Sequence, residues 1–283
     1  MKNIPLFFYL LIMSLPASAQ DYLNIITFNI RYDNPRDSLN AWQYRKDHAA
    51  SQILFHEAHI VGVQEALYSQ VIELGKRLPR YEYVGVGRTD GKQEGEFSAI
   101  FFDTRRLVSL QSATFWLSEH PDSTGSRGWD ANLPRIVTWA KFRDKKTGLK
   151  FFAFNTHFDH IGEIARRESA LLLLKKIKAI AGSDPVIVTG DFNSLPTDEP
   201  IVKITAADDP LRLTDSKKVS AAPHYGPNGT FTGFEQKEVR NQPIDYIFTK
   251  NRVKVLQHAT LSQSWEGRFS SDHFPVFARV AIK

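Results

Sequence analysis

Short runs of β-branched and aromatic residues recur along the chain and predict strands. Many of these runs alternate between apolar and polar residues, the period of two that marks a sheet with one buried face. The predicted strands cover residues 23–30, 59–64, 81–87, 97–103, 112–117, 136–142, 150–157, 185–190, 243–249 and 274–282.

Helical patterns are fewer and lie between some of these strands. In the clearest one, Leu173, Ile177 and Ile180 follow the i, i+4, i+7 spacing of one helix face. The predicted helices cover residues 42–57, 66–78 and 161–181. Strands outnumber helices, which favours a layered α/β sandwich over a simple parallel sheet. Residues 118–135 carry little apolar patterning and predict a long loop, a feature that is commonly functional.

The first residues have the pattern of a leader. A positive start at Lys2 precedes an apolar stretch, residues 4–16, and the small residues Ala17, Ser18 and Ala19 form an A-x-A cleavage site. We therefore expect a signal peptide over residues 1–19 and one mature domain over residues 20–283, secreted or periplasmic. An uncleaved anchor helix is the alternative, whereas attachment of lipid to a cysteine is excluded because the chain has none.

Composition limits the domain count and the class of partner. With 283 residues and 42% hydrophobic content, the chain can bury one large core without disulfides. There are 36 Lys and Arg against 31 Asp and Glu, and loss of Lys2 with the leader leaves a net charge of +4. This mild excess suits an anionic substrate but is far from the dense basic stripe of a dedicated nucleic-acid binder.

Polar side chains of one chemical kind occur at the ends of successive predicted strands. Each alone is typical of a turn or a helix cap. Together they suggest a shared site, because a carboxylate beside an apolar run is costly unless it is paired or bound to a cation. The residues in this pattern are Asn29, Gln64, Glu65, Asn155, His157, Asp191, Asn193, Asp245, Asp272 and His273.

These oxygen donors suit Mg²⁺ first, with Mn²⁺ or Ca²⁺ as alternatives, and argue against structural zinc. His157 and His273 add the means to hydrolyse a phosphate ester: a cation that polarises oxygen, a carboxylate that takes a proton from water, and an oriented imidazole. In the stretch GDFN, Asp191 and Asn193 are expected on one side while Phe192 points to the core. Gly190 is expected to let a ligand approach the backbone.

Six motifs, in order, carry a family resemblance: TFN, VQEA, NTHFDH, GDFN, IDYIF and SDHFPV. They resemble the endonuclease/exonuclease/phosphatase superfamily, the deoxyribonuclease I-like proteins, over essentially the whole mature chain. TFNIRYDN, GRTDGKQEGEF and FWLSEHPD further resemble a branch of secreted bacterial proteins. The resemblance implies a four-layer α/β sandwich in which two packed mixed β-sheets are flanked by helices, with the active site at one edge of the sheets.

The resemblance also implies a role for each motif residue on the metal side. Glu65 would be the principal metal ligand, with Asn29 and Asp272 close to the metal.

On the other side of the implied site lie the residues for proton transfer and phosphate contact. Asp191 would orient or deprotonate the attacking water, and Asn193 would donate to a phosphate oxygen. His273, held by Asp245, and His157 would contact the phosphate from opposite sides. All these positions hold the expected residue type, so the sequence predicts an active enzyme.

Substrate recognition is less determined by motifs, because specificity resides in loops. The arginines beside conspicuous polar stretches are candidates to grip phosphate or carboxylate groups, although each also fits a solvated surface position. Either Glu94 or Glu96 is a candidate partner for a site histidine, and His160 is a further candidate to line the site. The predicted substrate-binding residues are Arg31, Arg88, Glu96, Trp129, Arg135, Asp159 and Arg166.

Three hypotheses of function follow. The first is a metal-dependent phosphoesterase acting on a small phosphorylated organic compound or a glycan phosphodiester. The second is a secreted nuclease acting on DNA or RNA, which the modest charge favours less. The third is a binding protein that kept the fold, whose expected sign, substitution of Glu65, Asp191 or His273, is absent. We expect a monomer, and no hydrophobic hairpin or amphipathic segment for membrane insertion is evident.

Overall fold

The computed structural model describes residues 21–237 and 240–283. The predicted leader, residues 1–19, lies outside the described residues. Within the described ranges, no helix is long and apolar enough to cross a membrane.

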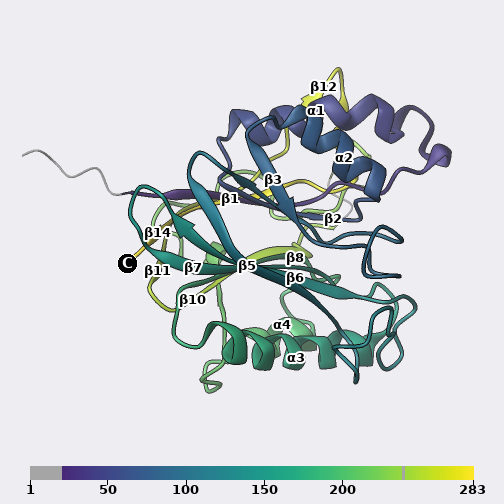
Figure 1. Cartoon of the computed structure of the whole chain (residues 1–283). Helices are drawn as coiled ribbons and strands as arrows, with labels where there is room; N and C mark the ends of the chain where they lie inside the picture. The colour runs from purple at the N-terminus through teal and green to yellow at the C-terminus, as the bar shows by residue number, and fades with distance from the viewer. Residues whose placement is uncertain (1–20, 238–239) are drawn as a thin grey trace, which may run out of the picture.

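Two six-stranded sheets form the centre of the molecule (Figure 1). In the first sheet β1 and β2 are parallel and the other neighbours are antiparallel. Its strands, in spatial order, are β11 (Val253–Thr260), β14 (Val276–Ile282), β1 (Leu23–Asn29), β2 (Ile60–Gln64), β4 (Ile100–Asp103) and β3 (Tyr81–Val84).

The second sheet is also mixed, with β7 and β8 parallel and the other neighbours antiparallel. Its strands, in spatial order, are β5 (Leu107–Trp116), β6 (Ile136–Asp144), β7 (Lys150–His157), β8 (Val186–Asp191), β10 (Asp245–Lys250) and β9 (Thr214–Asp215). A separate hairpin pairs β12 (Ser264–Trp265) with β13 (Arg268–Phe269).

Alternation along the strands creates both the central and the outer cores. On β7, Phe151 and Ala153 belong to the apolar cluster between the two sheets, whereas Phe152 and Phe154 pack on the opposite face with residues of the covering helix. This is the two-residue period expected of a strand that is buried on both faces.

Helices cover the outer face of each sheet and complete four layers, as predicted (Figure 1). α1 (Trp42–Phe55) and α2 (Tyr68–Arg77) lie on the first sheet, and α3 (Glu163–Ala181) and α4 (Glu199–Thr205) lie on the second. The short helices η1 (Pro35–Asn40) and α5 (Ser216–Val219) lie in connections.

Two differences from the predicted elements are at sheet edges, and α4, on the outer face of the second sheet, was also not predicted. β11 was not predicted, and β5 begins five residues earlier than its predicted range. Both are outermost strands, and both carry a register irregularity, between Val255 and Gln257 and between Ser109 and Gln111. Polar, partly solvated edge strands with a bulge lack the apolar alternation on which prediction depends.

The predicted loop, residues 118–135, is irregular but is fixed to the body of the protein. The side chain of Asp130 accepts hydrogen bonds from the backbone N–H groups of Ile164, at 3.2 Å, and Ala165, at 2.6 Å, in the first turn of α3. A carboxylate in this position satisfies free donors of the helix and opposes its dipole. The loop is therefore held at the end of the sandwich where β7 and β8 terminate.

Candidate active site

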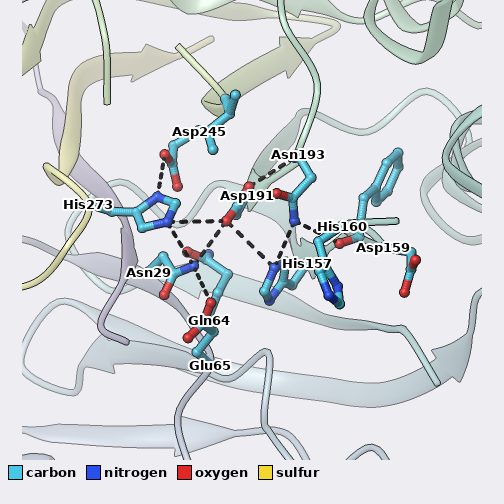
Figure 2. Close-up of polar contacts among 12 residues, drawn as sticks. Asn29, Gln64, Glu65, His157, Asp159, His160, Asp191, Asn193, Asp245 and His273 are labelled. Carbon is cyan, nitrogen blue, oxygen red and sulfur yellow. Dashed lines mark hydrogen bonds and ion pairs between the residues drawn. The ribbon is translucent and has the colours of Figure 1, made fainter. Parts of the chain in front are cut away.

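Strand register brings the predicted polar residues together. In the parallel pair β7 and β8, His157 lies opposite Asp191, and in the antiparallel pair β8 and β10, Asp191 lies opposite Asp245. In the first sheet, Asn29 lies opposite Gln64 at the ends of β1 and β2. The carboxyl ends of these parallel strands meet at one end of the sandwich, where Figure 2 shows their side chains converging.

A cavity of about 490 Å³ opens at this end. The predicted catalytic and metal residues that line it are Glu65, His157, Asp191, Asn193, Asp272 and His273. Asn29 and Asp245 do not line the cavity themselves. Asn29 contacts Asp191, and Asp245 contacts His273, from behind the cavity wall.

Asp191 is at the centre of the contacts. Its Oδ1 accepts a hydrogen bond from the backbone of Asn193 and its Oδ2 accepts one from the Asn29 side chain, both at 2.9 Å. Burial, followed by the nearby Asp245 carboxylate, raises the pKa of Asp191 to about 7. A carboxylate with this pKa is half ionised near neutral pH, which suits a general base.

His273 forms a buried dyad with Asp245. Its Nδ1 is 2.9 Å from Asp245 Oδ2, and its Nε2 is 3.8 Å from Asp191 Oδ2. Burial opposes the charged imidazole, but the charge and hydrogen bond of Asp245 outweigh it and raise the pKa of His273 to about 10. His273 is therefore a cation at neutral pH, with Nδ1–H donated to Asp245 and Nε2–H directed toward the centre.

His157, unlike His273, is neutral. Burial and the nearby Arg135 hold its pKa well below the usual value, so the ring is neutral. Asn193 Nδ2 donates one hydrogen to Phe158 O at 3.1 Å, which fixes the amide orientation, and lies 3.0 Å from His157 Nε2. Nε2 thus accepts, and the ring proton is on Nδ1, which is 3.9 Å from Glu96 Oε2.

Glu65 and Asp272 provide oxygen donors on the first sheet's side of the cavity. Asn29 donates to Glu65 Oε1 at 3.0 Å, and Arg31 lies 3.9 Å from Glu65 Oε2 and 3.8 Å from Asp272 Oδ2. Burial raises the pKa of Asp272. The nearby charge of His273 lowers it, the Glu65 carboxylate raises it, and the net pKa lies above the ordinary value. Two carboxylates that share a cavity fit a hard divalent cation.

A second possible metal group lies deeper. Asp191, Asp245 and His273 bring one potential ligand atom each within 4.8 Å of one another. Because Asp245 already engages His273 Nδ1, the Glu65 side, with the carboxylates of Glu65 and Asp272, is the better match to Mg²⁺. Asn29 turns its amide nitrogen toward Glu65, and its Oδ1 accepts a hydrogen bond from the Arg31 backbone N–H.

Three residues of the site have left-handed backbone conformations: Arg31 with φ 55°, Glu65 with φ 61° and Asn193 with φ 46°. Such conformations cost energy for residues other than glycine, least for asparagine, and they cluster at functional sites. Gly190, by contrast, is needed for packing: a Cβ there would lie 2.7 Å from Thr156 O. The expectation that Gly190 lets a ligand approach the backbone is therefore wrong.

The predicted substrate-binding residues divide into two groups. Arg31, Glu96 and Arg135 line the cavity, whereas the other four do not. Arg88 instead forms a bidentate ion pair with Glu96, at 2.7 and 3.0 Å, and so holds that carboxylate beside His157.

The remaining three are engaged behind the cavity wall or outside it. Asp159 pairs with Arg135 at 3.2 Å, and Arg166 donates to the backbone oxygen of Asp159 at 3.1 Å. Trp129 lies in the long loop, where its backbone N–H donates to the Glu119 carboxylate. Asp159 and Arg166 therefore act on the site through Arg135 and the cavity wall, whereas Trp129 is held in the loop by its backbone and does not line the cavity.

Six further cavity residues were not singled out from the sequence: Tyr32, Asn132, Leu133, Phe231, Arg240 and Ile244. Most lie in irregular segments, where no periodicity or motif distinguishes a cavity residue from any other loop residue. Signals were present for three of them: Tyr32 lies within the stretch TFNIRYDN, Ile244 opens the motif IDYIF, and Leu133 adjoins a polar stretch.

Comparisons with known proteins agree with the fold described above and identify a family. Residues 26–273 match the model of the Endonuclease/Exonuclease/phosphatase family. A Bacteroides vulgatus endonuclease/exonuclease/phosphatase structure is 44% identical, with a TM-score of 0.88, and the match covers 93% of this chain and 100% of that one. A mannosyl-6-phosphatase structure from Bacteroides thetaiotaomicron is 37% identical, with a TM-score of 0.88, covering 92% and 100%.

A more distant relative is an uncharacterised protein of Acanthamoeba polyphaga mimivirus, 30% identical over 165 residues. The match covers 56% of this chain, and the chain spans about 61% of the length of that viral protein.

Proposed function

Because the chain belongs to the endonuclease/exonuclease/phosphatase family, we propose that it is a phosphoesterase that hydrolyses its substrate by in-line attack of water with the help of a divalent cation. The observation that carries this proposal is the placement of Asp191, whose pKa is about 7, between a neutral His157 and a cationic His273. A base, a neutral imidazole and a cation are thus close together at one point of the cavity.

Asp191 would accept the proton of the attacking water. Its two oxygens are fixed by Asn29 and by the Asn193 backbone, so the carboxylate is held in one orientation. General-base catalysis requires the base within hydrogen-bond reach of water and a pKa near the working pH, and Asp191 meets the second condition through burial.

His273 would stabilise the charge that grows on the phosphoryl oxygens. Asp245 holds its ring and its charge, so Nε2–H is an oriented, cationic donor. Oriented donors in a buried site lower the barrier without reorganising during the reaction.

Asn193 and His157 lie on the other side of Asp191, where both amide hydrogens of Asn193 are used by Phe158 O and His157 Nε2. Contact of either residue with the phosphoryl group would require one of these bonds to be exchanged, so the donor role expected for Asn193 is not present in this arrangement.

Glu65 and Asp272, with Asn29 beside them, would hold the cation, for which Mg²⁺ is the first candidate and Mn²⁺ or Ca²⁺ the alternatives. When bound, a divalent cation acts as a Lewis acid that neutralises charge on phosphoryl oxygens.

We further propose a phosphorylated sugar or another small phosphorylated compound as the substrate. The similar structure named a mannosyl-6-phosphatase supports this choice, since it matches the chain along nearly its whole length. The cavity of about 490 Å³ is within the range of small-molecule sites. A net charge of only +5 for the full chain supplies little of the phosphate-gripping surface that a nuclease uses.

The leader motif also supports a proposal about where the protein acts. We propose that residues 1–19 are removed on export and that the mature protein acts outside the cytoplasm as a monomer.

The test of the proposed function is hydrolysis of p-nitrophenyl phosphate, bis(p-nitrophenyl) phosphate, mannose 6-phosphate and plasmid DNA, each with Mg²⁺, Mn²⁺, Ca²⁺ or EDTA. Metal-dependent hydrolysis of the small esters that is lost on Asp191→Asn is the expected result. Faster cleavage of DNA, with a steep salt dependence, would replace the proposed substrate by nucleic acid. Absence of all hydrolysis, together with absence of Mg²⁺ binding by titration, would refute the enzyme and leave a binding role.

A further inference from the structure

The cavity has two unlike walls on either side of the catalytic residues. We define the His160 wall as Asn132, Leu133, Arg135 and His160, and the Phe231 wall as Phe231, Arg240 and Ile244. Phe231 contacts the His273 ring, with centroids 5.0 Å apart, so the Phe231 wall is on that side. Figure 2 shows His160 beyond His157, on the side away from His273.

The His160 wall is rigid because Asp159 fixes it from behind. Asp159 is 1% exposed and accepts hydrogen bonds from Arg135 Nε at 3.2 Å, Leu133 N at 3.3 Å and Gly162 N at 2.8 Å. Burial opposes ionisation of Asp159, but these backbone donors and Arg135 lower its pKa to about 2. The positive charge of Arg135 is thus compensated by a permanent carboxylate.

Arg135 in turn fixes the tautomer of His160. Arg135 Nη2 is 2.9 Å from His160 Nδ1, and because a guanidinium can only donate, Nδ1 must accept. Burial and the Arg135 charge lower the pKa of His160, so the ring is neutral and Nε2 carries its proton. His160 therefore presents an N–H donor.

One donor of this wall lacks a partner among the described residues. Arg135 is 4% exposed, and its buried Nη1 pairs with none of the described residues. The guanidinium lines the main cavity and also a space of about 10 Å³ bounded by Arg88, Glu96 and His157. A ligand oxygen or a water is needed to satisfy Nη1, because an unpaired buried donor is costly.

The wall thus combines hydrogen-bonding groups with no net charge. A second phosphate would need uncompensated positive charge, and an alkyl group would leave the donors unpaired. Hydroxyl groups, which both donate and accept, match a neutral polar wall. We propose that the His160 wall recognises hydroxyl groups of the leaving alcohol, so that the substrate class is phosphate esters of sugars or polyols. This inference rests on the proposed function and names the leaving group for it.

The test compares two substrates of similar ring size: mannose 6-phosphate and cyclohexylmethyl phosphate, which lacks ring hydroxyls. The wild-type protein should prefer the sugar ester by about tenfold or more in kcat/KM, as expected for a site built to hydrogen-bond hydroxyls. His160→Ala should lose about tenfold on the sugar ester, the size of one neutral hydrogen bond, and change less than about twofold on the cyclohexyl ester. Asn132→Ala should show the same selective pattern.

Two controls separate recognition from folding. His160→Gln, which restores an N–H donor, should regain part of the preference. Ile161→Ala changes the adjacent side chain, which is 59% exposed and does not line the cavity, and should leave both rates unchanged.

Equal losses on both esters, or no loss on the sugar ester, would overturn the role of the His160 wall while leaving the phosphoesterase intact. Failure of the wild-type protein to hydrolyse the sugar ester while it hydrolyses p-nitrophenyl phosphate would overturn this inference alone, whereas absence of all hydrolysis and of Mg²⁺ binding would overturn the proposed function and this inference with it.

Discussion

Asn155 and Asp191 lie on neighbouring parallel strands, and both look alike in the sequence as polar residues at strand ends. Their surroundings differ. Asn155 is completely buried and uses its whole carboxamide: Oδ1 accepts from Gln64 at 2.7 Å and Thr189 at 3.0 Å, and Nδ2 donates to two backbone oxygens at 2.8 and 2.9 Å. The bonds to Gln64 and to the backbone oxygen of Val63 join the two sheets, because both residues are on β2, whereas Thr189 is on β8 in the same sheet as Asn155.

Asp191, two positions beyond Thr189 on β8, lines the cavity and carries a charge that burial makes unfavourable. It also lies 3.8 Å from a cationic histidine with which it forms no hydrogen bond. A fully paired polar group stabilises the assembly of the sheets, whereas a group with a shifted pKa and access to a cavity is available for chemistry. Completeness of hydrogen bonding thus separates the structural polar residue from the functional one.

The sharpest way to break this comparison is Asp191→Asn. We expect kcat/KM to fall by about 10²–10⁴-fold, because the amide cannot take the proton of water. Stability at pH 8 should stay the same or rise. Since the folded-state pKa of about 7 exceeds the ordinary value of 3.8, ionisation of Asp191 above pH 7 costs folding energy that the neutral amide does not.

Activity on p-nitrophenyl phosphate and urea denaturation at pH 8 measure the two halves of this prediction. A variant that is both inactive and markedly less stable would show that Asp191 is structural like Asn155.

The converse change is Asn155→Ala. We expect a loss of about 2–4 kcal/mol in the free energy of unfolding, because the Gln64 and Thr189 donors and two backbone oxygens lose a buried partner. The folded fraction should keep kcat/KM within about threefold of the wild-type value, since Asn155 does not line the cavity. Thermal denaturation and activity per folded molecule check both. A stable but inactive variant would contradict the structural assignment.

The pH dependence of activity tests whether Asp191 and His273 act in the charge states described above. Deprotonated Asp191 and protonated His273 are both required, so kcat/KM should rise about tenfold per pH unit up to about pH 7 and fall above about pH 10. A pH–rate profile between pH 5 and 11 measures both limbs. Asp245→Asn should move the descending limb to lower pH, because it removes the carboxylate that raises the pKa of His273. If the descending limb did not move, it would report the ionisation of a group other than His273.

The comparison of Asn155 with Asp191 also shows how much of the fold and of the site the sequence can predict. The sandwich and the residues at the cavity were predictable because apolar alternation identifies central strands, and because Asp191, His157 and His273 lie in motifs. The sequence could not separate Asn155 from His157, since hydrogen-bond completeness depends on the facing sheet. Nor could it predict the position of Arg88, which points to Glu96 and not to the cavity. Cavity residues such as Phe231 come from irregular segments without periodicity.

The smallest expected effect concerns Glu96, whose Oε2 is 3.9 Å from His157 Nδ1, beyond hydrogen-bond distance. His157 Nδ1 is buried and pairs with none of the described residues, so Glu96 orients the ring through charge alone. We expect Glu96→Gln to lower kcat/KM by about five- to tenfold, corresponding to about 1 kcal/mol. The Gln amide keeps one acceptor for Arg88 but removes the counter-charge of this buried guanidinium, so a loss of stability is expected and kcat/KM is compared per folded molecule. Arg88→Met should reproduce the kinetic loss by freeing Glu96. Kinetics on p-nitrophenyl phosphate with urea denaturation as the control measure this. A loss as large as that of Asp191→Asn would place Glu96 among the groups that take part in proton transfer, and no loss would mean that Asn193 alone orients His157.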